Sequence, residues 1–138
     1  MPVFFDTNIL LYAISPAVDE AAKREKAVQL LERQDGALSV QVLQEFYVQA
    51  TRVSRTNRIT NDQARELVET WTRFKVQDNT LAVLRSAIEI RTRYGFSYWD
   101  SAVVAAALAA GCTELFSEDL SHGQIVDGVR IVNPFHQD

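Results

Sequence analysis

The sequence alternates short apolar segments with longer segments of helical character, and this alternation constrains the fold more than any other feature. The short segments are rich in residues that favour strands, and the longer ones carry helix formers or apolar residues at helical spacing. Such an order favours the α/β class, with a parallel or mostly parallel sheet covered by helices on both faces. We expect strands at 3–5, 36–40, 75–77, 114–117 and 129–132, and helices at 9–14, 21–33, 42–53, 60–74, 81–94 and 101–110.

Several helix boundaries carry their own signals. Residues 60–63 and 97–100 both have the capping-box form that opens helices, and Gly95 is a C-terminal cap. The segment Ala102–Ala110 is apolar almost all round, which predicts a buried helix. A bilayer span needs about 20 residues, so no membrane segment is expected.

The chain is expected to form one domain over residues 1–138, because no linker, repeat or low-complexity run divides it. Acids outnumber Lys and Arg by 18 to 14, which argues against a general nucleic-acid coat. The single Cys112 cannot form an internal disulfide, and Asp6 interrupts any apolar leader, so a cytoplasmic location is expected. His122 and His136, with one Cys, are too few for a zinc site.

Four carboxylates stand at informative places in this pattern. Asp6 ends the first strand, Glu45 lies in the helix after the second, Asp100 opens the buried helix, and Asp119 follows the fourth strand. Ligands collect at the carboxyl ends of parallel strands, where we expect these residues to meet. Converging carboxylates repel one another unless a divalent cation binds them. Mg²⁺ at such a site suits phosphodiester hydrolysis by a metal-activated water.

Each acid also has a purely structural interpretation. Asp100 fits a helix cap, Asp6 and Asp119 fit caps or turns, and Glu45 lies on the flank of its helix, where a solvated side chain is expected. The functional interpretation therefore depends on the set, in which three Asp residues occupy the same end of a strand-to-helix passage.

Four segments in this order resemble the blocks of PIN domains, and most closely those of VapC-like toxins. Val3–Leu10 is an apolar strand that enters Asp-Thr-Asn, and Ser39–Phe46 carries an acid in the second block. Phe96–Ala102 resembles the third block and Leu115–Gly123 the fourth. The resemblance covers nearly the whole chain.

The resemblance implies a PIN-like three-layer α/β/α sandwich with a mostly parallel central sheet. It also implies an Mg²⁺- or Mn²⁺-dependent endoribonuclease that is the toxin of a type II toxin–antitoxin pair. Asp6 and Asp100 would be the principal metal ligands of the catalytic quartet, and Glu45 and Asp119 would complete the site or act through water.

The resemblance further assigns supporting residues and partners. Asn8 and Ser117 stand where the family supports its carboxylates by hydrogen bonds, with Ser117 in place of a frequent Thr. Glu118 is a possible extra ligand, although the family pattern favours Asp119. The implied partners are an RNA substrate, a cognate antitoxin that covers the site, and a second copy in a homodimer.

Some residues fit an RNA substrate as well as a structural role. Arg52, Arg55 and Arg58 follow one helix and suit phosphate contacts, or they are solvated cations near a helix C-terminus. Tyr98 and Trp99 can stack on an unpaired base. For Trp99, in the first turn of the buried helix, a place in the core is favoured.

Three other classes compete with the nuclease. A haloacid-dehalogenase-like phosphatase needs a second Asp where Asn8 stands and a late Lys, and a response-regulator receiver also needs that Lys; the last Lys is Lys75. A non-catalytic PIN-fold binding module would be favoured by loss of the acids, all of which are present.

The acidic surplus fits this interpretation. Without the quartet, 14 acids would face 14 bases. A cation in the pocket would offset negative charge where phosphate approaches, so the net charge argues against indiscriminate RNA binding but not against RNA cleavage.

Overall fold

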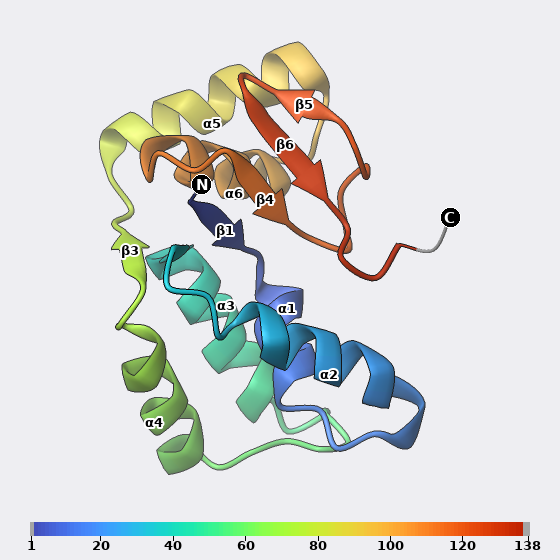
Figure 1. Cartoon of the computed structure of the whole chain (residues 1–138). Coiled ribbons are helices and arrows are strands. Elements are labelled where there is room, and N and C mark those ends of the chain that lie inside the picture. The colour runs from blue at the N-terminus through green and yellow to red at the C-terminus, as the bar shows by residue number, and fades with distance from the viewer. Residues whose placement is uncertain (1, 137–138) are drawn as a thin grey trace.

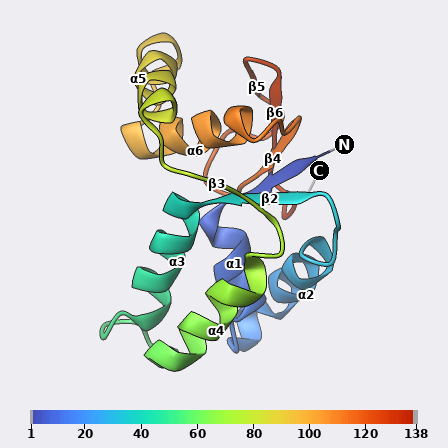
Figure 2. The same cartoon turned by 90° about the vertical axis from the view of Figure 1, so that its left-hand side faces the viewer.

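A computed structural model describes residues 2–136 and shows one sheet between two layers of helices (Figure 1, Figure 2). This architecture confirms the predicted three-layer α/β/α sandwich. The described strands are β1 (Val3–Phe5), β2 (Gly36–Ser39), β3 (Lys75–Gln77), β4 (Glu114–Phe116), β5 (Ile125–Val126) and β6 (Val129–Val132).

Figure 2 shows the two helical layers on opposite faces of the sheet. One layer contains α1 (Thr7–Ala13), α2 (Ala21–Leu30), α3 (Val40–Thr51) and α4 (Asn61–Trp71), with a short 3-10 turn η1 (Val18–Glu20) before α2. The other layer contains α5 (Leu81–Tyr94) and α6 (Tyr98–Ala109).

The strand order places a topological switch point at β1. The order across the sheet is β3-β2-β1-β4-β6-β5, and all neighbours are parallel except β5, which is antiparallel to β6. From β1 the chain builds outward to β2 and β3, and it then returns to add β4 on the other side of β1. The crevice between β1 and β4 is therefore where an open α/β sheet binds its ligand.

The core explains why the strands are so apolar. Phe4, Phe5 and Leu38 are fully buried because helices cover both faces of the sheet. Gly36 opens β2 where any larger residue would clash, since a Cβ there would lie 2.5 Å from the Phe5 ring and 2.8 Å from the Phe74 ring.

Helix α6 is buried as its composition predicts. Every residue from Ser101 to Ala107 is buried, because α5 covers the face of α6 that does not pack on the sheet (Figure 1). The predicted caps also form. Thr60 and Gln63 make a reciprocal capping box, and Gly95 ends α5 in the left-handed conformation.

The differences from the predicted elements have local causes. Helix α1 begins at Thr7, since Asp6 caps it. Strand β2 ends at Ser39, whose hydroxyl caps α3 by accepting from the Val42 amide. The sequence analysis missed β5, which pairs with β6 across the turn at Asp127 and Gly128. Both turn residues have positive φ, and Asp-Gly is a strong hairpin signal that could have predicted this pair.

Within residues 2–136, no helix has the length and apolarity needed to cross a membrane. The assignment of residues 1–138 to a single domain stays a prediction, and its first residue and last two residues lie outside the described part of the chain.

Candidate active site

The four predicted acids line one small hollow at the switch point between β1 and β4. We call this cavity of about 110 Å³ the acidic hollow. Asp6 follows β1, Asp119 follows β4, and Glu45 and Asp100 come from α3 and α6. Ten residues line it: Asp6, Thr7, Asn8, Leu11, Glu45, Gln49, Trp99, Asp100, Val103 and Asp119. The fold thus brings together residues that are up to 113 positions apart in the sequence.

Asp6 is the most deeply placed of the four, with 6% of its surface exposed. Its Oδ1 accepts a hydrogen bond from the Thr7 amide at 2.7 Å, and its Oδ2 accepts one from the Ser117 hydroxyl at 2.7 Å. Burial raises the pKa of Asp6 to about 6; the two hydrogen bonds oppose this rise, and the charges of Asp119 and Glu45 add to it. The site therefore holds a carboxylate whose negative charge the surrounding protein only partly compensates.

Asn8 and Ser117 connect the two strand ends. The Asn8 Nδ2 donates to Oδ2 of Asp119 at 3.1 Å, and its Oδ1 accepts from the Glu118 amide at 3.3 Å. The Ser117 hydroxyl accepts from the Asp119 amide at 3.2 Å while it donates to Asp6. These contacts connect Asp6 and Asp119 and fix the two carboxylates relative to each other.

Glu45 is half-buried and faces the hollow, where it is held by two residues that the sequence analysis did not single out. The Thr7 hydroxyl donates to its Oε2 at 3.2 Å, and the Gln41 amide donates to its Oε1 at 3.1 Å. Gln41 precedes Glu45 by four residues, a spacing that places both on one face of α3. That spacing is a signal that could have predicted this contact.

Asp100 is half-buried at the start of α6. Its amide donates to the Ser97 hydroxyl at 3.1 Å, so Ser97 caps the helix as expected. Burial raises the pKa of the Asp100 carboxyl; a hydrogen bond with Ser97 opposes the rise, and the charges of Asp119 and Glu45 add to it. Asp100 therefore combines a position in the helix cap with a place in the acidic hollow.

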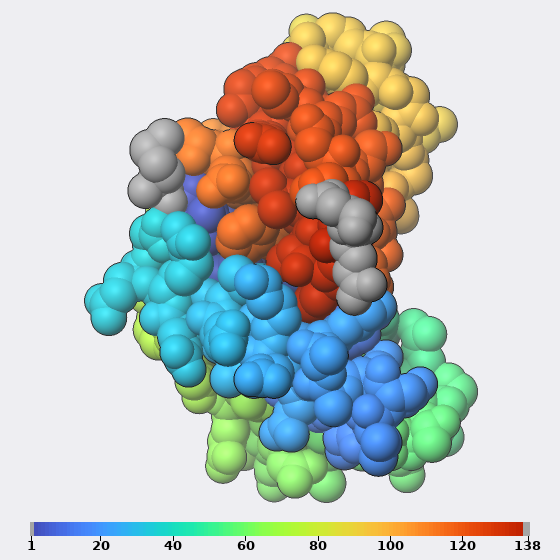
Figure 3. Space-filling view, turned by 45° about the vertical axis from the view of Figure 1, so that its right-hand side comes forward, coloured from blue at the N-terminus to red at the C-terminus, as the bar shows by residue number. Residues whose placement is uncertain are grey.

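Glu118, adjacent to Asp119, is turned away from the acidic hollow. Its carboxylate accepts from Lys23 at 2.5 Å and from the Tyr12 hydroxyl at 2.5 Å. Burial acts to raise the pKa of Glu118, but these two hydrogen bonds outweigh it, and the pKa is lowered. The Tyr12 ring also meets Phe135 edge-on, and Figure 3 shows the last described residues, coloured red, beside the blue helices of the N-terminal part. Glu118 thus joins the loop after β4 to α1 and α2.

The donor set fits a hard divalent cation. Among the described residues that line the acidic hollow, none is Lys, Arg or His, and the ionisable side chains are all carboxylates. Within residues 2–136, no three His, Cys, Asp or Glu side chains meet the geometry of a metal cage. What fits a cation is the chemistry of the donors, since Mg²⁺ binds carboxylate oxygens, usually one or two from the protein, and keeps several waters.

The structure separates the residues predicted to contact RNA. Arg52, at the end of α3, lines a second hollow next to the acidic one, whose lining also includes Glu45 and Trp99. Arg55 and Arg58 do not line the acidic hollow. The Arg55 Nε is buried and has no hydrogen-bond partner among residues 2–136.

The prediction that Trp99 belongs to the core is wrong, since 64% of its surface is exposed. Burial of α6 begins only at Ser101, and the first turn lies at the rim of the acidic hollow. Tyr98, beside it, is half-buried against the core.

The protein is therefore an α/β sandwich whose carboxylates line a hollow at the topological switch point, where their oxygens could bind a cation. The sequence model of the PIN domain family matches residues 3–126. The chain therefore belongs to the PIN domain family. No protein with a curated description matches the sequence significantly.

Solved structures share this fold at low sequence identity. A toxin–antitoxin complex from Klebsiella pneumoniae matches with a TM-score of 0.70 and 22% identity, covering 98% of this chain and 99% of the other. A VapC toxin from Mycobacterium tuberculosis that cleaves the sarcin–ricin loop matches with a TM-score of 0.64 and 19% identity, covering 85% and 91%. VapBC2 from Rickettsia felis, bound to a DNA fragment from its promoter, matches with a TM-score of 0.66 and 17% identity. The match covers 95% of this chain and 97% of the other.

Proposed function

We propose that this PIN-domain protein is a metal-dependent endoribonuclease and the toxin of a type II toxin–antitoxin pair. The observation that carries the proposal is the acidic hollow, which four carboxylates from separate parts of the chain line with no basic residue among the described lining. The fold shared with a VapC toxin that cleaves the sarcin–ricin loop supports RNA as the substrate.

The chain's own residues would divide the work. Asp6 and Asp100 would be the principal ligands of Mg²⁺ or Mn²⁺, and Glu45 and Asp119 would complete the site directly or through water. When bound, such a cation lowers the pKa of a coordinated water and offsets the charge of the phosphate. Ser117 orients Asp6 by its hydrogen bond, and Asn8 orients Asp119.

The experiment that tests the function is cleavage of a total-RNA pool by the purified full-length protein. We expect cleavage in Mg²⁺ or Mn²⁺ and none in EDTA, with recovery when the cation is restored in excess. An Asp6→Asn variant purified identically controls for contaminating nuclease. Equal cleavage by both proteins, or cleavage that persists in EDTA, would contradict the proposal, and no cleavage in any cation would favour a non-catalytic binding module.

A cognate antitoxin is part of the same proposal. The Klebsiella pneumoniae structure with this fold is a toxin–antitoxin complex, which supports a small protein partner here. A short reading frame beside the gene, whose product co-purifies with this chain and blocks RNA cleavage, is the expected finding.

A cytoplasmic location stays a prediction from the lone, buried Cys112.

A homodimer is the expected oligomeric state, and α5 offers a surface for it. Leu81, Leu84 and Ile88 lie on one face of α5, with 58%, 40% and 51% of their surfaces exposed. Contiguous exposed apolar residues of this kind mark protein interfaces. We propose that this face packs against a second copy of the chain.

Light scattering tests this surface at micromolar concentrations. The wild type should have about twice the chain mass of 15.6 kDa, and Leu84→Glu should shift it to the monomer by burying an unpaired charge. Ala82→Glu places the same charge at an exposed position of α5 about 160° round the helix from Leu84; it is the matched control and should stay dimeric. A monomeric wild type, or a dimeric Leu84→Glu variant, would refute the α5 interface.

A further inference from the structure

Trp99 is exposed although the middle of its helix, from Ser101 to Ala107, is buried. Its exposed fraction is 64%, whereas the other tryptophan, Trp71, is 5% exposed. The indole is among the largest apolar surfaces that a side chain can leave in water. It also meets Tyr98 edge-on with a ring-centroid separation of 5.1 Å, and Tyr98 packs against the core. The exposed ring is therefore held by a neighbour that packs against the core.

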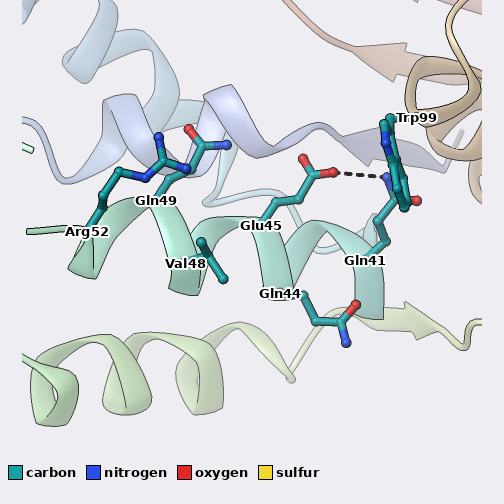
Figure 4. A pocket seen from close by; sticks show the side chains of 7 residues that line it. All are labelled: Gln41, Gln44, Glu45, Val48, Gln49, Arg52 and Trp99. Carbon is teal, nitrogen blue, oxygen red and sulfur yellow. Dashed lines mark hydrogen bonds between the residues drawn. The ribbon is translucent and has the colours of Figure 1, made fainter. Parts of the chain in front are cut away.

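A second hollow adjoins the acidic one and shares three residues with it. We call this cavity of about 330 Å³ the glutamine hollow; its lining is Gln41, Gln44, Glu45, Val48, Gln49, Arg52 and Trp99. Glu45, Gln49 and Trp99 line both hollows. Figure 4 shows Trp99 beside Gln41 at one end and Arg52 at the other, with Glu45 between them. A ligand in the glutamine hollow therefore lies directly beside the acidic hollow.

We propose that Trp99 is a stacking platform for an unpaired RNA base next to the phosphate that lies in the acidic hollow. This inference rests on the proposed nuclease function and adds that the substrate is unpaired at that position. A base can stack on an exposed indole only when it is not already stacked within a duplex. The side-chain amides of Gln41 and Gln49 can both donate and accept, which suits the edge of a base.

The chemistry of the lining favours RNA over a protein surface. Of its seven residues only Val48 and Trp99 are apolar, and both a cation and an anion are among the rest. The centres of protein interfaces are depleted of charge, whereas single-stranded nucleic acid is bound by aromatic rings beside basic groups. Arg52 supplies that positive charge at the far end of α3. From Gln41 to Arg52 the helix rises about 16 Å, so a ligand that touches both ends is longer than one base.

A second copy of the chain is the competing occupant. A further hollow connects Trp99 with Leu81 and Leu84, which lie on the α5 face proposed for the homodimer. If Trp99 belonged to that interface, it would be shielded by the second copy and not by RNA. The test below therefore measures the accessibility of Trp99 with and without RNA.

Fluorescence provides the binding readout, because Trp71 is buried and Trp99 is the exposed tryptophan. The Asp6→Asn variant, expected not to cleave, is mixed with an unstructured oligouridylate or with an RNA duplex of equal length. We expect the single strand to quench the emission and protect Trp99 from acrylamide, with a much smaller effect of the duplex. Trp99→Phe, which leaves only Trp71, should remove the signal change.

Cleavage provides the second readout, on an RNA that the wild type cuts. Trp99→Ala should lower kcat/KM by between about 5-fold and 150-fold, the range for loss of one stacked base. Trp99→Phe should retain most of the rate because it keeps an aromatic face. Trp99→Leu, which keeps apolar area without that face, should behave as Trp99→Ala does.

Three results would overturn the inference. They are equal protection by duplex and single strand, equal rates for Trp99→Phe and Trp99→Leu, and a free protein in which Trp99 is already shielded and Trp99→Ala becomes monomeric. The last result would assign Trp99 to the dimer interface. Failure of the proposed function is separate, since a wild type that cleaves no RNA in Mg²⁺ refutes the nuclease, while quenching by the oligouridylate still decides the role of Trp99.

Discussion

Asp6→Asn should abolish RNA cleavage and yet make the metal-free protein more stable at neutral pH. Removal of a residue that only hydrogen-bonds a metal ligand typically costs 10- to 100-fold in activity. Loss of a principal ligand itself should therefore cost at least about 100-fold. Stability should move the other way because the Asp6 carboxylate is buried and its pKa is raised from 3.8 to about 6. Asn keeps a side-chain oxygen that can cap α1 and carries no charge.

The pH dependence follows from the direction of that pKa shift. A carboxyl whose pKa is raised on folding favours the folded state while it is protonated, below about pH 4, and this contribution is lost as the pH rises through 6. At pH 7.5 in EDTA the free energy of unfolding of Asp6→Asn should therefore exceed that of the wild type by about 1–3 kcal/mol. The difference should vanish near pH 4.

Denaturant unfolding at several pH values, with and without Mg²⁺, measures both effects. Mg²⁺ should raise the Tm of the wild type more than that of Asp6→Asn, because binding to the folded state stabilises it. Asp78→Asn, at an exposed acid outside both hollows, should match the wild type in stability and cleavage. An Asp6→Asn protein that is less stable at pH 7.5 in EDTA, or that keeps a tenth of the cleavage rate, would rule out this account of Asp6.

Much of this fold is encoded locally, which is why the sequence predicts it. The apolar run before Asp6, the capping box at residues 60–63 and the left-handed Gly95 act within a few residues of the elements they define. The strand order is not local. That β4 pairs with β1, and not with β3, depends on contacts between residues more than a hundred positions apart. The meeting of Asp6 and Asp119 could be expected only from the general behaviour of parallel sheets.

The acidic residues show the same limit in the details of the site. Periodicity places Glu45 on the flank of its helix, where a solvated side chain is expected, but α1 and α6 enclose that flank and Thr7 bonds the carboxylate. The prediction for Trp99 is wrong in the opposite sense, because it expects burial and the side chain is exposed. An apolar sequence does not show which turn of the helix extends beyond the elements that cover it. In both cases the burial is decided by how neighbouring elements pack, which the periodicity of a single helix does not show.

Asp100→Asn and Glu118→Gln should have very different effects on cleavage, although both remove one acid near the site. Asp100 lines the acidic hollow, and burial, together with the charges of Asp119 and Glu45, raises its pKa. Its loss should lower kcat by at least about 100-fold, because losing a metal ligand should cost more than losing a residue that only hydrogen-bonds a ligand. It should also raise the Mg²⁺ concentration needed for half-maximal activity.

Glu118→Gln should leave the cleavage rate within about 3-fold of the wild type, which is a change of under about 1 kcal/mol in the activation free energy. Its carboxylate is bound by Lys23 and Tyr12 and does not line the acidic hollow. The substitution should instead lower stability by up to about 1 kcal/mol, the usual value of a partly exposed ion pair. Cleavage and Mg²⁺ titration of the two variants side by side decide the matter. If Glu118→Gln loses activity and Asp100→Asn keeps it, Glu118 is a metal ligand and Asp100 is not, which would contradict the proposed set of four acids.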